Sequence, residues 1–275
     1  MNLLSVLIIT LNEEKNIARC IDSVKRVADE VILLDCYSDD NTVSIARKKG
    51  AVIYQQKFEG YIEQKNCVLQ LASYDFVLSL DADEAIDETL ERSILKEKEN
   101  FTYSAYRMNR CNNYCGRFIR HGLWYPDKKI RLFDKRLAKW GGLNPHDKIQ
   151  LANNCTVKHL PGDILHFSHS SIEEHIQQNN KLSSIAAHSL YKIGKRGHWT
   201  KLVINPGWAF FKGYFLRLGF LDGFYGFMIA INTSHQTFLK YIKLYYLQRA
   251  ENKKPVSAVT STIKRISKNP HQKIS

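Results

Sequence analysis

The chain has 275 residues, enough for one large α/β domain or for a domain with an appendage. Hydrophobic residues make up 44% and charged residues 24%, an ordinary composition for a soluble globular protein with a real core. The net charge of +13 is uneven: residues 1–180 carry 24 basic and 25 acidic side chains, whereas residues 181–275 carry 16 basic side chains and two acidic ones. A basic region of this kind seeks polyanions such as nucleic acid, anionic lipid or phosphorylated glycans.

The first residues, MNLLSVLIITLNEE, have no basic n-region and no small-residue cleavage site, which argues against a signal peptide and for a first buried strand. Six cysteines in a chain without an export signal are expected to be reduced thiols in a cytoplasm. Cys111 and Cys115 form a lone CxxxC without a second pair, which disfavours a zinc site.

Hydrophobic periodicity predicts an alternation of strands and helices over the first 100 residues. Strands are expected at 3–10, 30–35, 51–56 and 75–83, and helices at 15–27, 39–50, 61–73 and 85–100. The right-handed crossover rule converts this order into an α/β fold with a mostly parallel sheet and helices on both faces. Short strands and turns are expected over 103–142, and a long helix over 172–194.

Polar and acidic residues gather where three of the predicted strands end: TLNEE (10–14), DCYSDDNT (35–42) and DADE (81–84). Ligands of parallel sheets bind at the carboxyl ends of the strands. Any one of these segments is explained as well by an ordinary solvated strand end, but three together favour a binding site. Neither GxGxxG nor GxxxxGK[ST] is present, which disfavours dinucleotide-binding dehydrogenases and P-loop enzymes.

The D-x-D of Asp81 and Asp83 ends the fourth predicted strand. Two carboxylates at this spacing suit a hard divalent ion, Mg²⁺ or Mn²⁺, which accepts substrate phosphates as the rest of its shell. A D-x-D alone is common by chance, and its place in the β/α series strengthens the interpretation.

These motifs resemble those of family 2 glycosyltransferases with the A-type fold, which use nucleotide-diphosphate sugars. The resemblance rests on TLNEE, on the D-x-x-S-x-D-x-T of Asp35, Ser38, Asp40 and Thr42, and on LDADE. YPDKKIRLFDKRLAKWGGLNPHDK, the segment that begins DILHFSHSS, and LRLGFLDGFYGF resemble one bacterial branch, which contains lipopolysaccharide core glucosyltransferases. The likeness extends over about residues 1–250.

The resemblance implies roles for residues on the donor side. Thr10, Asn12 and Glu13 would line the nucleotide site, and Asp35 would face the base or ribose. Many relatives have two acidic residues in a row where this chain has Asp35 followed by Cys36.

Asp81 would lie near the sugar nucleotide, Asp83 would bind the metal, and Glu84 would support the site. Arg131 is a candidate for binding diphosphate or a substrate carboxylate, because the guanidinium fork suits both anions. The segment RLFDKR also fits an exposed strand and turn, and neighbouring basic residues compete for the same role.

On the acceptor side, the resemblance makes Asp147 the general base of an inverting transfer, with His146 orienting it or touching phosphate. Relatives more often have glutamate at the position of Asp147. The alternative is a simple turn with Asn144 and Pro145.

The segment 205–248 is rich in aromatic residues and interrupted by Lys212, Arg217 and Asp222, which argues against a transmembrane span. Two interpretations remain open: helices lying in a membrane interface, and a helical hairpin packed on the catalytic domain. The basic tail, 251–275, is expected to be flexible.

The expected layout is a catalytic domain over 1–200, with a nucleotide-sugar half (1–100) and an acceptor half (101–200), followed by a helical membrane-proximal appendage (201–250). The expected function is transfer of a hexose, glucose, from a UDP sugar to a lipid-linked glycan such as lipopolysaccharide core. The enzyme would be cytoplasmic and peripherally bound to the inner membrane, with an anionic membrane surface as partner and no nucleic acid. The alternatives are a polyprenyl-phosphate sugar transferase and a non-catalytic nucleotide- or polyanion-binding module.

Overall fold

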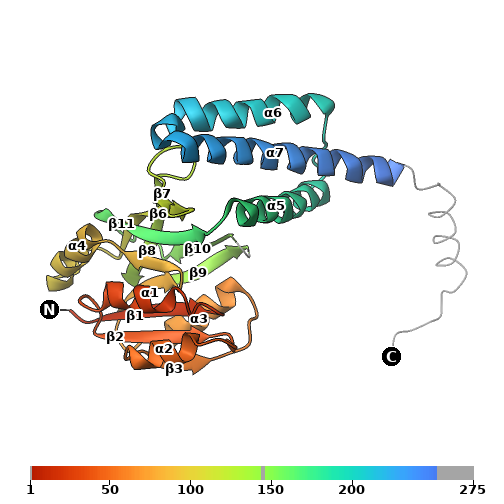
Figure 1. Cartoon of the computed structure of the whole chain (residues 1–275). Helices are drawn as coiled ribbons and strands as arrows, with labels where there is room; N and C mark the ends of the chain where they lie inside the picture. Colours follow the sequence, from red (N-terminus) through yellow and green to blue (C-terminus); the bar gives the residue numbers. More distant parts are fainter. Residues whose placement is uncertain (1, 144–145, 253–275) are drawn as a thin grey trace, which may run out of the picture. The chain divides into compact units, whose positions relative to one another are not determined.

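The computed structural model describes residues 2–143 and 146–252, which fall into two compact units (Figure 1). The first unit spans 1–170 and the second unit 171–275. This division assigns the predicted helix 172–194 to the second unit, whereas the sequence groups it with the catalytic domain. The functional boundary at 200 stays a prediction, and most of the predicted tail lies outside the described residues.

The first unit is built on a nine-stranded mixed sheet. In their order across the sheet, the strands are β3 (Val52–Gln55), β2 (Glu30–Asp35), β1 (Leu4–Thr10), β4 (Phe76–Asp81), β8 (Asp127–Asp134), β6 (Ala105–Tyr114), β11 (Val157–His169) and β5 (Glu84–Ile86), and β7 (Arg117–Phe118) pairs with β6. The four strands from β3 to β4 are parallel, as the sequence predicts. Beyond them, β8 runs antiparallel to both β4 and β6, while β11 is parallel to β6 and antiparallel to β5.

Helices cover both faces of the sheet. The buried side chains of β1 therefore alternate between two hydrophobic cores, one on each face. Leu4, Val6 and Ile8 pack on one side, and Leu7 packs on the other. The helices of the first unit are α1 (Ile17–Val24), α2 (Thr42–Lys48), α3 (Tyr61–Leu71) and α4 (Glu88–Glu99). Residues of α1, α2 and α4 join the first core and residues of α3 join the second, which confirms the predicted fold class.

Strand β5 is a departure from the predicted order, since the sequence expects a helix from residue 85. It pairs with β11, whose residues lie about 80 positions later in the chain. Asp87, expected in the first turn of the next helix, is instead the N-cap of α4, where its side chain accepts a hydrogen bond from Leu90 N (2.7 Å). A separate two-stranded sheet is formed by β9 (Ala138–Leu143) and β10 (His146–Leu151).

The second unit is helical and includes the predicted C-terminal appendage. It contains α5 (Ile172–Lys192), α6 (Trp199–Phe211), the π-helical turn η1 (Lys212–Leu216), the 3₁₀ turn η2 (Gly219–Asp222) and α7 (Gly223–Asn252). Both α5 and α6 pack on α7 (Figure 1). Lys243 of α7 donates hydrogen bonds to Asn180 Oδ1 (2.7 Å) and Ser183 Oγ (2.7 Å) of α5.

Across the described residues, no helix taken by itself has the length and apolar composition needed to cross a membrane. Trp199–Leu216 and Gly219–Ala250 meet that test only as a pair, bent by 72°.

Candidate active site

The turns that follow β1 and β2 are bound together by hydrogen bonds. Asn12, with a left-handed φ of 55°, donates from its backbone to Ser38 Oγ (2.9 Å) and accepts from Asp39 N at its side-chain oxygen (3.0 Å). Glu13 N donates to Thr42 Oγ1 (2.8 Å). Two of the three predicted motifs therefore form one continuous rim at the carboxyl ends of adjacent strands.

Thr10 and Asp35 are neighbours in the ladder between β1 and β2. Asp35 is fully buried, and its Oδ2 accepts hydrogen bonds from Ser38 N (3.0 Å) and Gln55 Nε2 (3.0 Å). This carboxylate therefore holds the turn after β2, and its predicted contact with the base or ribose stays a prediction. Thr10 Oγ1 is buried without a hydrogen-bond partner in the described part of the chain.

Glu13 lies in the electrostatic field of other carboxylates. Burial raises the pKa of Glu13, the hydrogen bond from Asn16 Nδ2 (2.6 Å) opposes this, and the charges of Asp83 and Asp40 raise it further. A cation bound near Asp83 would reverse the last effect. The predicted nucleotide residue and the predicted metal ligand are thus electrostatically coupled.

Asp81, at the end of β4, is held by two cations. Its Oδ2 lies 3.1 Å from Arg131 Nη2, and its Oδ1 lies 3.0 Å from Lys65 Nζ. Burial opposes ionisation, but Arg131 and Lys65 together hold the pKa of Asp81 well below its usual range. Glu84 is fully buried, accepts from Asp81 N (3.0 Å) and also binds Arg131 Nη2 (3.0 Å). The contacts place Glu84 beside Asp81 and Arg131, and its supporting role stays a prediction.

Arg131 is almost completely buried, which excludes the alternative of an exposed strand and turn for this residue. Its Nη2 bridges Asp81 and Glu84, whereas Nε and Nη1 are buried and have no hydrogen-bond partner among the described residues. Buried guanidinium donors are almost always satisfied, so two donors left over beside a strand end indicate a place for an anionic ligand.

Lys65 of α3 joins the two ends of the site. Its ammonium lies 2.8 Å from Asp147 Oδ2 and 3.0 Å from Asp81 Oδ1, and 4.4 Å from the ring centroid of Trp140. The structure therefore brings Asp147, on β10, to the same cation that holds the donor-side Asp81. Sequence reasoning missed Lys65, although it shares the buried face of α3 with Val68 and Leu69, where periodicity favours an apolar residue.

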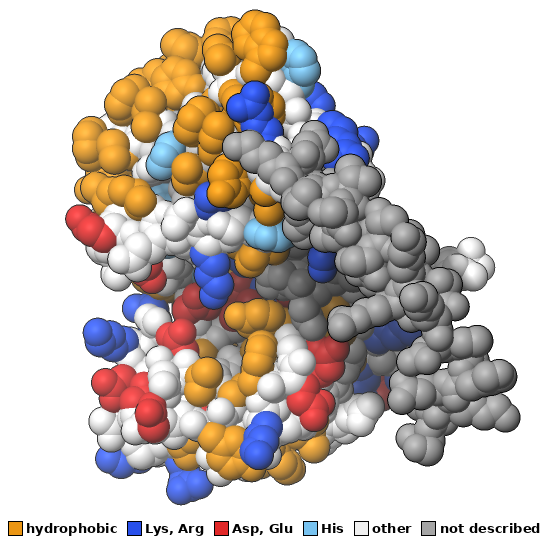
Figure 2. All heavy atoms as spheres, turned by 90° about the vertical axis from the view of Figure 1, so that its right-hand side faces the viewer, with side chains coloured by type: hydrophobic (Ala, Val, Ile, Leu, Met, Phe, Trp, Pro, Cys, Tyr) orange, Lys and Arg blue, Asp and Glu red, His pale blue; other side chains and the backbone are white. Residues whose placement is uncertain are grey.

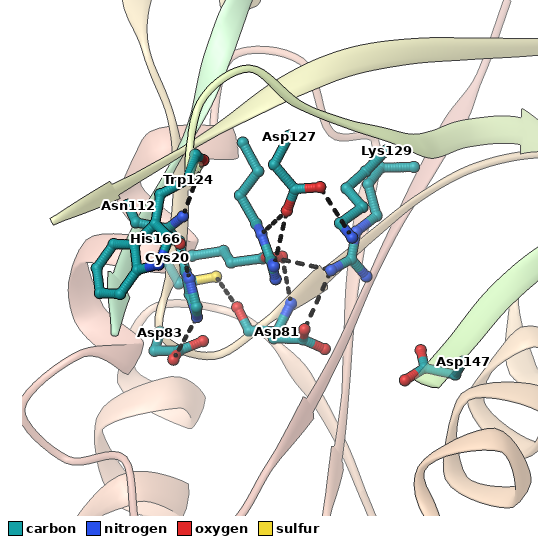
Figure 3. Close-up of polar contacts among 12 residues, drawn as sticks. Cys20, Asp81, Asp83, Asn112, Trp124, Asp127, Lys129, Asp147 and His166 are labelled. Carbon is teal, nitrogen blue, oxygen red and sulfur yellow. Dashed lines mark hydrogen bonds and ion pairs between the residues drawn. The ribbon is translucent and has the colours of Figure 1, made fainter. Parts of the chain in front are cut away.

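Asp83 faces His166, a histidine of β11. His166 Nε2 lies 3.1 Å from Asp83 Oδ2, and His166 Nδ1 lies 2.6 Å from Asn112 Oδ1 (Figure 3). Asn112 Nδ2 donates to Trp124 O (3.4 Å), which orients the amide so that its oxygen faces the ring. His166 therefore donates from Nδ1 and turns Nε2 toward the carboxylate.

At 3.1 Å, this pair is satisfied either by a proton on His166 Nε2 or by a cation bound to both groups. Asp83 and His166 thus fit a divalent ion, since Mn²⁺ accepts both oxygen and imidazole ligands. Within the described residues no third His, Cys, Asp or Glu completes such a group, so diphosphate and water would supply the remaining ligands. The side chain of His146 lies outside the described residues, and its role stays a prediction.

Comparison with known proteins agrees with this geometry. The family model described as glycosyl transferase family 2 matches residues 5–159. An uncharacterized glycosyltransferase of Rickettsia typhi is 34% identical over 254 residues, covering 89% of this chain and 87% of that protein. The lipopolysaccharide core biosynthesis glycosyltransferase LpsC of Rhizobium meliloti is 28% identical over 255 residues, covering 88% of this chain and 92% of that protein.

Among solved structures, S. aureus TarS is similar with a TM-score of 0.43 and 16% identity, over 66% of this chain and 39% of that one. This score is too low to carry an argument. The α/β sheet with carboxylates at its strand ends, together with the full-length relatives, identifies an enzyme that transfers sugars. The chain belongs to glycosyl transferase family 2.

Proposed function

We propose that this glycosyltransferase moves a hexose, glucose, from UDP to a lipid-linked glycan of the lipopolysaccharide core type, with inversion at the anomeric carbon. The observation that carries the donor side is the buried fork of Arg131, with two unpartnered nitrogens in the described structure, beside Asp81. The acceptor class rests on the likeness to LpsC along nearly the whole of both chains.

Arg131 would bind the diphosphate of the donor. Its Nη2 is fixed by Asp81 and Glu84, which leaves Nε and Nη1 to donate to phosphate oxygens. Such charge-assisted hydrogen bonds are stronger than neutral ones, and the side chains that cover these two buried nitrogens would have to move aside for the diphosphate to reach them. Thr10, Asn12, Glu13 and Asp35 would line the nucleotide.

Asp83 and His166 would hold a divalent ion, Mn²⁺ or Mg²⁺. The mixed oxygen and nitrogen pair favours Mn²⁺, because Mg²⁺ prefers oxygen ligands. When bound, the ion supplies Lewis-acid stabilisation of the departing diphosphate. Asn112 fixes the His166 ring in the orientation that presents Nε2 to this position.

Asp147 would take the proton of the acceptor hydroxyl as it attacks the sugar from the face opposite the diphosphate. Its Oδ2 is bound by Lys65, while Oδ1 is left to accept the proton. Lys65 also binds Asp81, so one lysine sets the spacing between the donor contact and the base. The acceptor, being lipid-linked, would place the enzyme peripherally at the inner membrane, on its cytoplasmic side.

The test is a transfer assay with UDP-glucose, GDP-mannose and dTDP-glucose on purified lipopolysaccharide core acceptor. We expect turnover with UDP-glucose, and the anomeric configuration of the product, read by NMR, to be inverted. Asp147→Asn should lower kcat by about 10²–10⁴-fold without weakening UDP binding. The matched control is Asp22→Asn, an exposed aspartate of α1, which should leave kcat unchanged. Unaltered turnover in Asp147→Asn would remove this residue from the role of base.

A further inference from the structure

The junction between α6 and α7 displays large apolar side chains where helix junctions are ordinarily polar. Its six exposed members, called the apolar tip, are Phe215, Leu216, Leu218, Phe220, Leu221 and Phe224. The most exposed of them are Phe224 at 65%, Leu216 at 56% and Leu221 at 53% of their full surface. Contiguous exposed apolar surface of this kind marks an interaction site.

The junction is a tightly packed element and not a loose loop. A Cβ on Gly226 would lie 1.8 Å from the backbone oxygen of Gly219, and a Cβ on Gly219 would lie 2.7 Å from the backbone oxygen of Gly213. Only glycine permits these approaches, and Asp222 is buried between them in the chain. The GFLDG segment singled out in the sequence is therefore a compact turn that directs Phe220 and Leu221 outward.

Apolar exposure continues along α6 on side chains such as Trp199, Val203 and Trp208. Figure 2 shows hydrophobic side chains gathered over the helices of the second unit, with basic side chains among them. From Trp199 to Ala250 the chain has six lysines and arginines and a single acidic residue, the buried Asp222. Lys212, just before the tip, and Arg217, between Leu216 and Leu218, are both exposed.

We propose that the apolar tip docks into the interface of an anionic lipid bilayer. The tip residues would enter the boundary of the acyl chains, and Lys212 and Arg217 would bind lipid phosphates beside it. Charge complementarity selects a bilayer over a second copy of the chain, because pairing two tips would bring the basic side chains of both copies together. The apolar tip would thus be the surface that binds the membrane at the inner-membrane location proposed above.

The test is flotation of the full chain with vesicles of phosphatidylcholine alone or with 30% phosphatidylglycerol. It needs neither sugar nucleotide nor acceptor, so it can fail while glycosyl transfer stands. We expect binding to the anionic vesicles, weakened at least tenfold by Leu221→Ser/Phe224→Ser. Two matched variants should bind as the original chain does: the apolar exchange Leu221→Met/Phe224→Leu, and Leu3→Ser/Val52→Ser at equally exposed positions of the first unit.

The basic flank is tested separately. Lys212→Gln/Arg217→Gln should weaken binding to anionic vesicles by about tenfold, and to neutral vesicles not at all, with the difference disappearing at high salt. Arg92→Gln/Lys96→Gln, two exposed cations of α4, should change neither.

Three results would overturn the proposal. The first is no vesicle binding by the original chain, and the second is full binding by Leu221→Ser/Phe224→Ser. The third is a dimer in sedimentation velocity that the same double variant dissociates, because a second copy would then cover the tip.

Discussion

Lys65 binds one carboxylate on each side of the site. Because Lys65 is buried, its positive charge should contribute strongly to the stability of the fold. It lies between Asp81 and Asp147 and is almost fully enclosed. The acidic residues of the site stand out in the sequence because carboxylates at strand ends are conspicuous. A lysine within an amphipathic helix is ordinary, and only its position on the buried face of α3 distinguishes it.

Replacing this lysine should cost stability as well as activity. Lys65→Met leaves two carboxylates without their shared cation, and we expect the free energy of unfolding to fall by about 3 kcal/mol. Lys49→Met is the matched control, since Lys49 pairs with Asp22 at the surface and should contribute at most about 1 kcal/mol. Urea unfolding at neutral pH measures both. Equal losses would mean that burial of the Lys65 pair has no energetic consequence.

Tyr125 should give the first unit a stability that depends on alkaline pH. Burial raises the pKa of Tyr125 to about 12, and the hydrogen bond from its hydroxyl to Asp163 Oδ1 (3.0 Å) contributes to the shift. The folded state therefore retains a proton that the unfolded chain releases near pH 10. The contribution of the protonated Tyr125 to the free energy of unfolding is complete below pH 10 and is lost as the pH rises toward 12.

Absorbance at 295 nm checks this by spectrophotometric titration. The original chain should show one late-ionising tyrosine that Tyr125→Phe lacks, and that variant should lose less stability between pH 10 and 12. Superimposable titration curves would contradict the assignment.

At the scale of elements, local sequence patterns predicted the helices and parallel strands well. They did not predict which strands pair across long distances in the chain. The helices and parallel strands up to β4 fall within a few residues of their predicted bounds, because periodicity, glycine and charge act within one element. Strand β5 was missed because its pairing with β11 is long-range. Strand β8 likewise pairs with β4, which lies far earlier in the chain.

Two glycines of the second unit should respond in opposite directions to the same change. Gly226→Ala places a methyl group against the backbone of Gly219 and should destabilise the junction by about 3 kcal/mol. Gly207→Ala, in α6 with open space around it, should stabilise the helix by about 0.5–1 kcal/mol. Thermal unfolding followed by circular dichroism distinguishes them, and a neutral Gly226→Ala would show that the junction is less tightly packed than described.

At the scale of the whole molecule, ligand binding should appear as stability. With UDP at about 100 times its dissociation constant in the presence of Mn²⁺, UDP binding should raise the free energy of unfolding by about 2.7 kcal/mol. Chelation with EDTA should remove the part of this stabilisation that depends on the metal. Asp83→Asn should lack the same metal-dependent part, whereas the control Asp22→Asn should show the full stabilisation. A shift that is the same with and without divalent ion would refute the metal role of Asp83.

The sequence predicts site residues well where a motif lies at the end of a predicted strand. It predicts them less well where a distant strand returns to the site. The motifs after β1 and β2 predicted that Thr10, Asn12, Glu13 and Asp35 lie near one another, and the two turns do lie side by side. Their roles in binding the donor stay predictions. His166 is not among the site residues predicted from the sequence, because nothing in the sequence brings β11 beside Asp83. The contact depends on a sheet order in which β5 returns to the far edge.

That sheet order also limits how the enzyme can move. Strand β4 carries Asp81 at its end, and it pairs through Phe76, Val77 and Leu78 with β8, the strand of Arg131. The strands that carry Asp81 and Arg131, both donor-side residues, therefore share one hydrogen-bonded sheet, and swinging them apart would break its ladder. Asp147 instead lies on the separate sheet of β9 and β10, so the ladder fixes the donor side and not the distance to the base. Any rearrangement during turnover must be confined to segments that leave the sheet, such as the turns at its carboxyl edge.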